Sequence, residues 1–249
     1  MLTDTHCHIF KENYDNIDEI LANLEANNIK RIIINGYNLE TNQEVLALTK
    51  KYPNVYGSLG IHPNYIDETK DKIIDFIKEN INQPKIIAIG EIGLDYYHSK
   101  DIKNEQITCF KELLTLAEEN NKPVIIHNRD ATEDLINILK QHKLKGIMHC
   151  FNGSYETAKE YIKMGYKLGI GGIITFKNAK LGEIIEKLSV KDILLETDSP
   201  YITPEPYRKY QNEPKYLSEV AKKVAEIYEI TDEKLLLILE ENLAEIFDF

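Results

Sequence analysis

The hydrophobic residues of this 249-residue chain follow two alternating patterns. Short runs rich in aliphatic and β-branched residues are typical of buried strands. They predict eight strands, at residues 2–8, 31–35, 55–59, 86–90, 124–127, 146–150, 167–170 and 193–196. Between them, apolar residues recur at a helical period. These stretches predict helices at residues 17–27, 42–51, 72–79, 105–119, 133–141 and 155–164. Strands that alternate with helical crossovers indicate an α/β protein with a parallel sheet, and eight of them predict a (β/α)8 TIM barrel.

The pattern changes after Pro200. The stretch YITPEPYRKYQNEP contains three prolines, so we expect a loop there. Two helices are predicted beyond it, at residues 215–229 and 232–247. The second contains the apolar run LLLILEENLAEIF, whose helical spacing favours packing on the bottom or flank of the barrel over a membrane or partner helix. Since the chain shows no linker or low-complexity stretch, we expect one domain over residues 1–249.

Composition and charge narrow the class of protein. Hydrophobic residues make up 43% and charged residues 29% of the chain, which fits a soluble globular protein. The sequence contains no long apolar stretch and no signal-peptide pattern, so we expect neither a membrane span nor secretion. Three cysteines without CxxC spacing predict a reduced, cytoplasmic protein. The formal net charge of −11 argues against broad adhesion to nucleic acid, but it allows a nucleic-acid enzyme whose positive charge comes from bound metal ions.

The first candidate for chemistry is the N-terminal stretch LTDTHCHIF. On an extended strand, side chains two positions apart point to the same face. His6 and His8 therefore project together, with Thr5 and Cys7 on the other side. This pair alone leaves two interpretations open, a shared metal ion or two polar residues of an exposed edge.

Polar residues recur at the predicted strand ends, where such barrels carry their active sites. Five of the seven histidines and two acids lie at or just after these ends: His6, His8, His62, Glu91, His127, His149 and Asp198. A single histidine or acid there often has an ordinary structural role. A whole set at one barrel mouth would leave buried polar groups unpaired unless cations lie among them. The spacing therefore predicts a pair of divalent cations bridged by a carboxylate.

The same segments carry a family resemblance. The HxH of the first strand, GIHP, GEIGLDYY, HNRDA, HCFNGS and ETDSPYITPEPYR occur in this order. Together they resemble the TatD family of metal-dependent deoxyribonucleases, which belongs to the amidohydrolase-type barrels. The resemblance runs from Thr3 to about Phe247. Asn128 and Asn152 stand where the family commonly has serine, and Lys209 replaces a usual glycine.

The resemblance implies roles for individual residues. His6 and His8 would hold one metal with Asp198, and Glu91 would bridge to a second metal held by His127 and His149. His62 would touch the scissile phosphate or its neighbour. Arg129 and Arg208 would contact phosphate, with Glu205 between them and the metals. By position, Asp4 and Glu196 are expected either to orient metal-bound imidazoles or to hydrogen-bond the backbone at the strand ends.

These roles combine into a hypothesis of function. We expect a metal-dependent hydrolase that cleaves phosphodiester bonds of DNA as a 3′–5′ exonuclease, with Asp198, Glu91 and His62 as catalytic residues. Magnesium or manganese would support activity, and zinc also suits the imidazoles. The expected partner is a DNA end or a short single-stranded segment, with no membrane and no obligate protein partner. The alternative is a metal-dependent deacylase or amidohydrolase, for example one that acts on D-aminoacyl-tRNA. A non-catalytic binding barrel is a more distant interpretation.

Overall fold

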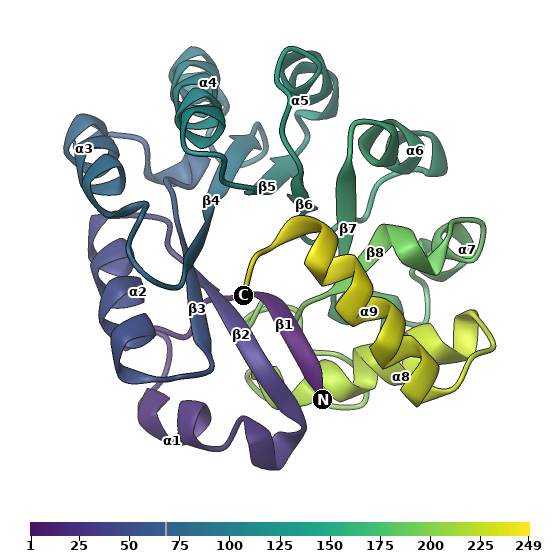
Figure 1. Cartoon of the computed structure of the whole chain (residues 1–249). Coiled ribbons are helices and arrows are strands. Elements are labelled where there is room, and N and C mark those ends of the chain that lie inside the picture. The colour runs from purple at the N-terminus through teal and green to yellow at the C-terminus, as the bar shows by residue number, and fades with distance from the viewer. Residues whose placement is uncertain (68) are drawn as a thin grey trace.

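Eight parallel strands form one sheet in sequence order, from β1 to β8 (Figure 1). The computed structural model describes residues 1–67 and 69–249. The strands are β1 (Leu2–Cys7), β2 (Ile29–Asn35), β3 (Val55–Leu59), β4 (Ile86–Asp95), β5 (Val124–Arg129), β6 (Gly146–Met148), β7 (Tyr166–Ile170) and β8 (Ile193–Leu195). The sheet curls into a nearly closed barrel, which confirms the predicted TIM-barrel fold.

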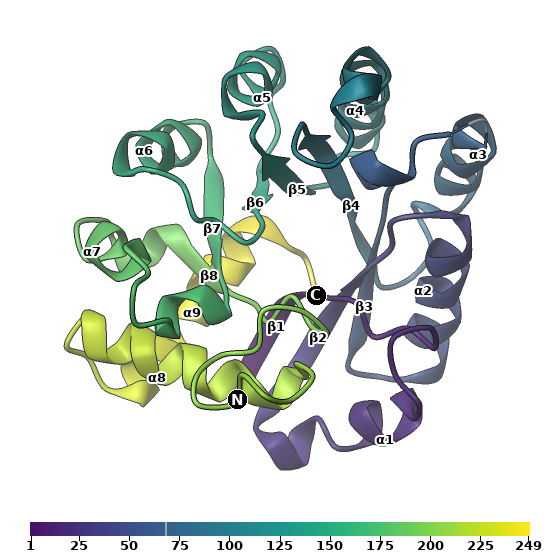
Figure 2. The same ribbon diagram turned by 180° about the vertical axis from the view of Figure 1, so that it is seen from behind.

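Helices surround the strands on the outside of the barrel, as both views of the ribbon show (Figure 1, Figure 2). They are α1 (Ile17–Ala22), α2 (Leu39–Lys51), α3 (Lys70–Asn80), α4 (Lys103–Glu119), α5 (Thr132–Leu139), α6 (Tyr155–Lys163), α7 (Leu181–Ile185), α8 (Leu217–Ile227) and α9 (Asp232–Ile246). The predicted helix at 17–27 is instead α1 followed by a 3₁₀ turn at Glu25–Asn27. The sequence did not predict α7, because five residues are too few to reveal a helical period.

Strand β4 is longer than the predicted 86–90. It continues to Asp95, so Glu91 lies inside the strand rather than after its end. The extension pairs with β5, with Gly93 opposite His127. Gly93 has a φ of 152°, and a Cβ atom there would lie 1.9 Å from the carbonyl oxygen of His127. The two strands therefore approach this closely only because residue 93 is glycine.

The barrel closes between β1 and the segment that follows β8. The His8 amide donates to Ser199 O at 2.7 Å, and the Asp198 amide donates to His6 O at 2.9 Å. Cys7 and Ser199 form a parallel bridge. These few bonds place Asp198 directly beside His6 of β1 and His8, which follows the strand.

Helix α9, which is yellow in Figure 1, covers one end of the barrel. Leu243, Ile246 and Phe247 are buried with strand residues such as Ile33 and Ile125. This packing confirms that the apolar run of the last helix faces the barrel. Within residues 1–67 and 69–249, the helices are too short or too polar to cross a membrane.

Candidate active site

Glu91 lies at the centre of a buried cluster of imidazoles at the carboxyl ends of the strands. Its Oε2 atom lies 3.4 Å from His6 Nε2 and 3.3 Å from His8 Nε2. Its Oε1 atom lies 2.9 Å from His127 Nδ1 and 3.3 Å from His149 Nε2. The two oxygens of one carboxylate thus face two different pairs of imidazoles.

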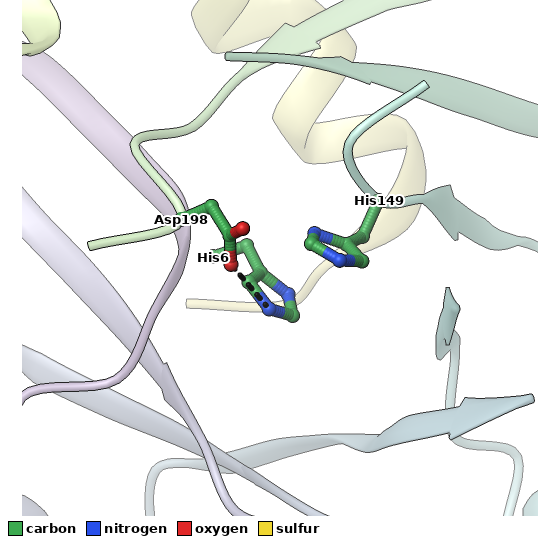
Figure 3. Close-up of side chains that lie close together, drawn as sticks. All are labelled: His6, His149 and Asp198. Carbon is green, nitrogen blue, oxygen red and sulfur yellow. Dashed lines mark ion pairs between the residues drawn. The ribbon is translucent and has the colours of Figure 1, made fainter. Parts of the chain in front are cut away.

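Asp198 completes the first of these sets. Its Oδ1 atom lies 3.6 Å from the Nε2 atoms of both His6 and His8. The two Nε2 atoms are themselves 3.1 Å apart. Figure 3 shows the Asp198 carboxylate directed at His6, whose ring stacks on that of His149 at a centroid distance of 3.8 Å. Residues from both ends of the chain therefore meet here.

The outward-facing nitrogens of two imidazoles are held by hydrogen bonds. His8 Nδ1 donates to the carbonyl oxygen of Asn35 at 2.9 Å. His149 Nδ1 donates to Glu196 Oε1 at 3.1 Å, and the same oxygen accepts the Cys150 amide at 2.6 Å. Each bond leaves Nε2 free to face the cluster. Glu196 therefore makes both contacts that its position predicted.

Charge in this cluster is balanced between carboxylates and imidazoles. Burial opposes protonation of His8 and His149, but the surrounding carboxylates outweigh it. They raise the pKa of His8 to about 10 and that of His149 to about 9. Burial also opposes ionisation of Glu91, yet the neighbouring imidazoles hold its pKa well below the ordinary value. The cluster thus attracts positive charge strongly.

The donor set fits two divalent cations. One candidate group joins His6, His8 and Glu91, and another joins Glu91, His127 and His149. Within each group, the ligand atoms lie within 4.8 Å of one another. Imidazole nitrogens together with carboxylate oxygens suit zinc, iron, nickel or manganese. Glu91 belongs to both groups, as a bridging ligand must.

The chain also matches a known protein family. A family model described as TatD related DNase matches residues 3–248. The chain belongs to this family. The match confirms the resemblance carried by the strand-end motifs.

The TatD-family relatives are similar over their full lengths. YabD of Bacillus subtilis (strain 168), an uncharacterised metal-dependent hydrolase, is 41% identical over 253 residues, which cover 99% of each chain. YcfH of Escherichia coli (strain K12), named in the same way, is 32% identical, covering 99% of this chain and 95% of YcfH. The crystal structure of YjjV, a TatD homologue of E. coli K12, superimposes with a TM-score of 0.92 at 28% identity, covering 100% of this chain and 98% of that one.

His62 lies beside the imidazole cluster around Glu91, with its Nε2 atom 3.6 Å from Glu91 Oε1. The backbone N–H of Asn64 donates to His62 Nδ1 at 3.1 Å. Burial lowers the pKa of His62 to about 3, so its ring is neutral. Because Nδ1 accepts a hydrogen bond, the ring hydrogen lies on Nε2 and faces the cluster.

Two cavities meet at the cluster. One of about 500 Å³ is lined by His8, His62, Glu91 and three tyrosines, Tyr37, Tyr65 and Tyr201. The other, of about 520 Å³, is lined by residues of β5 and of the loops after β5 and β6, including Asn128 and Asn152. Both cavities share His127, Arg129, His149, Asp198 and Ile202. A substrate that crosses the cluster therefore finds room on both sides.

The expected phosphate-binding residues lie in different places. Arg129 lines both cavities, with its guanidinium 4.1 Å from the centroid of the Tyr97 ring. Arg208 instead lies 4.1 Å over the Phe176 ring and donates to Thr203 O. As far as the structure describes the chain, neither Arg208 nor Glu205 lines the two cavities. Their roles stay predictions.

Asp4 makes backbone contacts rather than contacts with an imidazole ring. Its Oδ1 atom accepts from the backbone N–H groups of His6 and Thr197, at 3.3 and 2.9 Å. Its Oδ2 atom accepts the Thr197 hydroxyl at 2.6 Å. Of the two expectations for Asp4, the structure supports the strand-end hydrogen bond, which ties β1 to the segment carrying Asp198.

Sequence reasoning missed one buried acid, Asp95. Its Oδ2 atom lies 3.3 Å from His127 Nε2. It belongs to the motif GEIGLD and stands four residues after Glu91. On a strand, this spacing puts both acids on one face. Had the sequence predicted that β4 continues beyond Gly90, this spacing would have revealed Asp95.

Proposed function

We propose that this TatD-family chain hydrolyses phosphodiester bonds of DNA, acting on a 3′ end or a short single-stranded segment. At the coarser level it is a metal-dependent hydrolase, as family membership and its curated relatives support. The observation that carries the proposal is the position of Glu91. Its two oxygens face separate imidazole pairs, which is the arrangement that a two-metal hydrolase needs.

The six candidate ligands divide into two sets. His6, His8 and Asp198 would hold one cation, and His127 and His149 would hold the other, with Glu91 shared. When bound, such cations lower the pKa of water and neutralise charge on the phosphate oxygens. Magnesium or manganese would support activity on DNA, and zinc also suits the imidazole-rich set.

Asp198 and two further side chains act on the attacking water or on the substrate in this proposal. The neutral ring of His62 would donate its Nε2–H to a phosphate oxygen. Asp198, whose pKa the neighbouring imidazoles hold below its ordinary value despite burial, stays ionised and would take a proton from the attacking water. Arg129, at the junction of the cavities, would pair with a flanking phosphate.

The experiment is a nuclease assay with metal-free protein to which Mn²⁺ or Mg²⁺ is returned. A single-stranded oligonucleotide labelled at its 5′ end should yield a ladder of shortened, labelled products. The same oligonucleotide labelled at its 3′ end should release labelled mononucleotide at once. D-aminoacyl-tRNA serves as a parallel substrate, and rapid deacylation without DNA cleavage would refute the proposal in favour of a deacylase.

Replacing Glu91 with glutamine tests the central residue. The Glu91→Gln substitution keeps the shape of the side chain but removes its charge. We expect DNA hydrolysis to fall by about 10³-fold or more, in line with the loss of a preorganised charge at a reacting phosphate. Circular dichroism should show the fold intact.

A surface pair provides the matched control. Glu118 Oε2 accepts from His142 Nδ1 at 2.9 Å on the outside of the barrel. Glu118→Gln makes the same change to a glutamate–histidine pair away from the cluster, and it should keep wild-type turnover. Wild-type turnover in Glu91→Gln would refute the bridging role.

A further inference from the structure

Asp95, the last residue of β4, is a buried carboxylate at which several segments meet. Its Oδ1 atom accepts from the backbone N–H groups of Tyr97 and His98, at 2.9 and 2.8 Å. Its Oδ2 atom accepts from His98 Nδ1 at 2.9 Å, from Asn64 Nδ2 at 3.2 Å and from His127 Nε2 at 3.3 Å. The carboxylate thus joins the loops after β3 and β4 to β5.

The carboxylate oxygens of Asp95 have no lone pair left to bind a metal ion. A carboxylate offers about four lone-pair directions. Five N–H donors already share them. His62, Asp95 and His127 lie close enough to form a metal-binding group by distance alone. An ion there would have to displace several hydrogen bonds, which argues that Asp95 is not itself a ligand.

The two nitrogens of His127 face two different carboxylates. Nδ1 lies 2.9 Å from Glu91 Oε1, inside the cluster, and Nε2 faces Asp95 outside it. An ionised carboxylate only accepts hydrogen bonds. The contact with Asp95 therefore keeps a hydrogen on Nε2, which leaves the Nδ1 lone pair for the cluster whenever the ring is neutral.

We propose that Asp95 is a positioning residue that fixes the tautomer and orientation of the His127 ring, so that Nδ1 is the metal-binding nitrogen. The inference rests on the metal site of the proposed function. The anchoring of Asp95 explains why it can do this. Gln106 on α4 accepts the Asp95 amide at 2.8 Å and donates to the Asp95 carbonyl at 2.9 Å, which fixes the backbone of this residue.

Asp95→Asn separates this role from a merely structural one. Asparagine supports the backbone turn to residues 97 and 98 as well as aspartate does, because one oxygen suffices for two N–H groups. That orientation places the amide NH₂ group against His127 Nε2, where it can only donate. The His127 hydrogen would then move to Nδ1, the nitrogen needed for the metal. A merely structural role predicts that asparagine keeps both metal affinities, whereas a positioning role predicts that one of them falls.

The test is a calorimetric titration of the metal-free protein with Mn²⁺, which needs no substrate. We expect two ions bound per wild-type chain. In Asp95→Asn we expect two ions still, but one of them bound about 10–100-fold more weakly, as is typical when a partner of a ligating histidine is removed. The thermal midpoint of the metal-free variant should fall by roughly 2–4 °C, the cost of about one hydrogen bond in a protein of this size, because Asn64 Nδ2 loses its acceptor while the Oδ1 contacts remain.

Ser99→Ala is the matched control, since it removes the Ser99 Oγ–Asn64 Oδ1 hydrogen bond of 2.8 Å in the same loop and changes no contact of Asp95 or of an imidazole. It should keep both Mn²⁺ affinities. If it weakens binding as much as Asp95→Asn does, Asp95 acts only through the loop and the inference is wrong. Three ions in the wild type and two in Asp95→Asn would instead make Asp95 a ligand, which also overturns it.

A measurement on the wild-type chain needs no variant. In the zinc-loaded protein, long-range ¹⁵N–¹H correlations of the His127 ring should place its hydrogen on Nε2. A hydrogen on Nδ1 would overturn the inference. Because neither readout involves DNA, a chain that binds two ions in an Asp95-dependent way but leaves DNA intact would refute the proposed function alone.

Discussion

At the scale of single residues, the candidate centre is a set of imidazoles whose ring nitrogens have different partners. His8, His127 and His149 each have one nitrogen bound to a carbonyl or carboxylate outside the cluster and the other directed at Glu91. His6 differs, because its Nδ1 atom is buried and has no hydrogen-bond partner within the part of the chain that the structure describes. Each ring nitrogen that faces Glu91 can bind either a proton or a metal ion, and the two compete.

This competition predicts a pH dependence of metal affinity. The pKa values of His8 and His149, about 10 and about 9, lie above neutral pH. Both rings are therefore doubly protonated and positively charged in the metal-free protein. Binding a cation must release these protons. Affinity should therefore rise with pH between 6.5 and 8.5, by about tenfold per unit for each proton released.

Titration of Mn²⁺ in buffers with different heats of protonation measures the number of protons released. We expect between one and two per chain at pH 7.5. An affinity that is the same at pH 6.5 and 8.5 would show that the rings are already neutral before the metal binds.

At the scale of elements, buried polar side chains fasten helices to the strand ends. Asn42 on α2 is fully buried. Its Nδ2 group donates to Gly60 O at 2.8 Å, and its Oδ1 atom accepts the Gly60 amide at 3.0 Å. Gly60 follows β3 and stands two residues before His62. The Asn42 side chain thus fixes the position of the loop that carries His62 relative to α2.

Asn42→Ala would leave both backbone groups of Gly60 without partners. We expect a loss of about 2–4 kcal/mol in unfolding free energy, since each buried unpaired group costs about 1–3 kcal/mol. Urea unfolding of the metal-free protein measures it. Asn80→Ala on α3 is the control, because among residues 1–67 and 69–249 the Asn80 side chain donates only to Phe76 O of its own helix. Equal losses in the two variants would contradict the role of Asn42.

At the scale of the whole molecule, the barrel brings together charged side chains from remote parts of the chain. β1 supplies His6, and His8 follows it directly; β4 supplies Glu91, β5 supplies His127, and Asp198 follows β8. Gathering them costs free energy because like-charged and buried groups approach one another. Divalent cations bound at the cluster would offset this cost.

The folded chain should therefore be markedly more stable with metal than without it. At a Mn²⁺ concentration about 100-fold above the dissociation constant, binding adds about 2.7 kcal/mol, which raises the melting temperature by roughly 5–10 °C in a protein of this size. Scanning calorimetry with Mn²⁺ and with a chelator gives the shift. His8→Ala should lose most of it, and an equal shift in that variant would mean that Mn²⁺ stabilises the chain elsewhere.

Local patterns were sufficient for the fold and for much of the site. The rhythm of apolar runs predicted all eight strands, and strand alternation placed His6 and His8 on one face. The position of Asp95 was not predicted, because β4 was expected to end at Gly90. The pairing of residues 92–95 with residues 126–129 of β5 carries the strand five residues further. The ends of elements depend on such contacts with neighbouring strands, which a local pattern does not contain.

By itself, the sequence determined the barrel, the family and the residue types at the strand ends, because periodicity and motif spacing are local properties of the chain. Only the tertiary structure decided how those residues divide. It directs one oxygen of Glu91 to His6 and His8 and the other to His127 and His149, turns Asp4 toward the backbone, and holds Arg208 on Phe176. These arrangements depend on distances and hydrogen bonds between segments far apart in the chain, which arise only when the barrel closes.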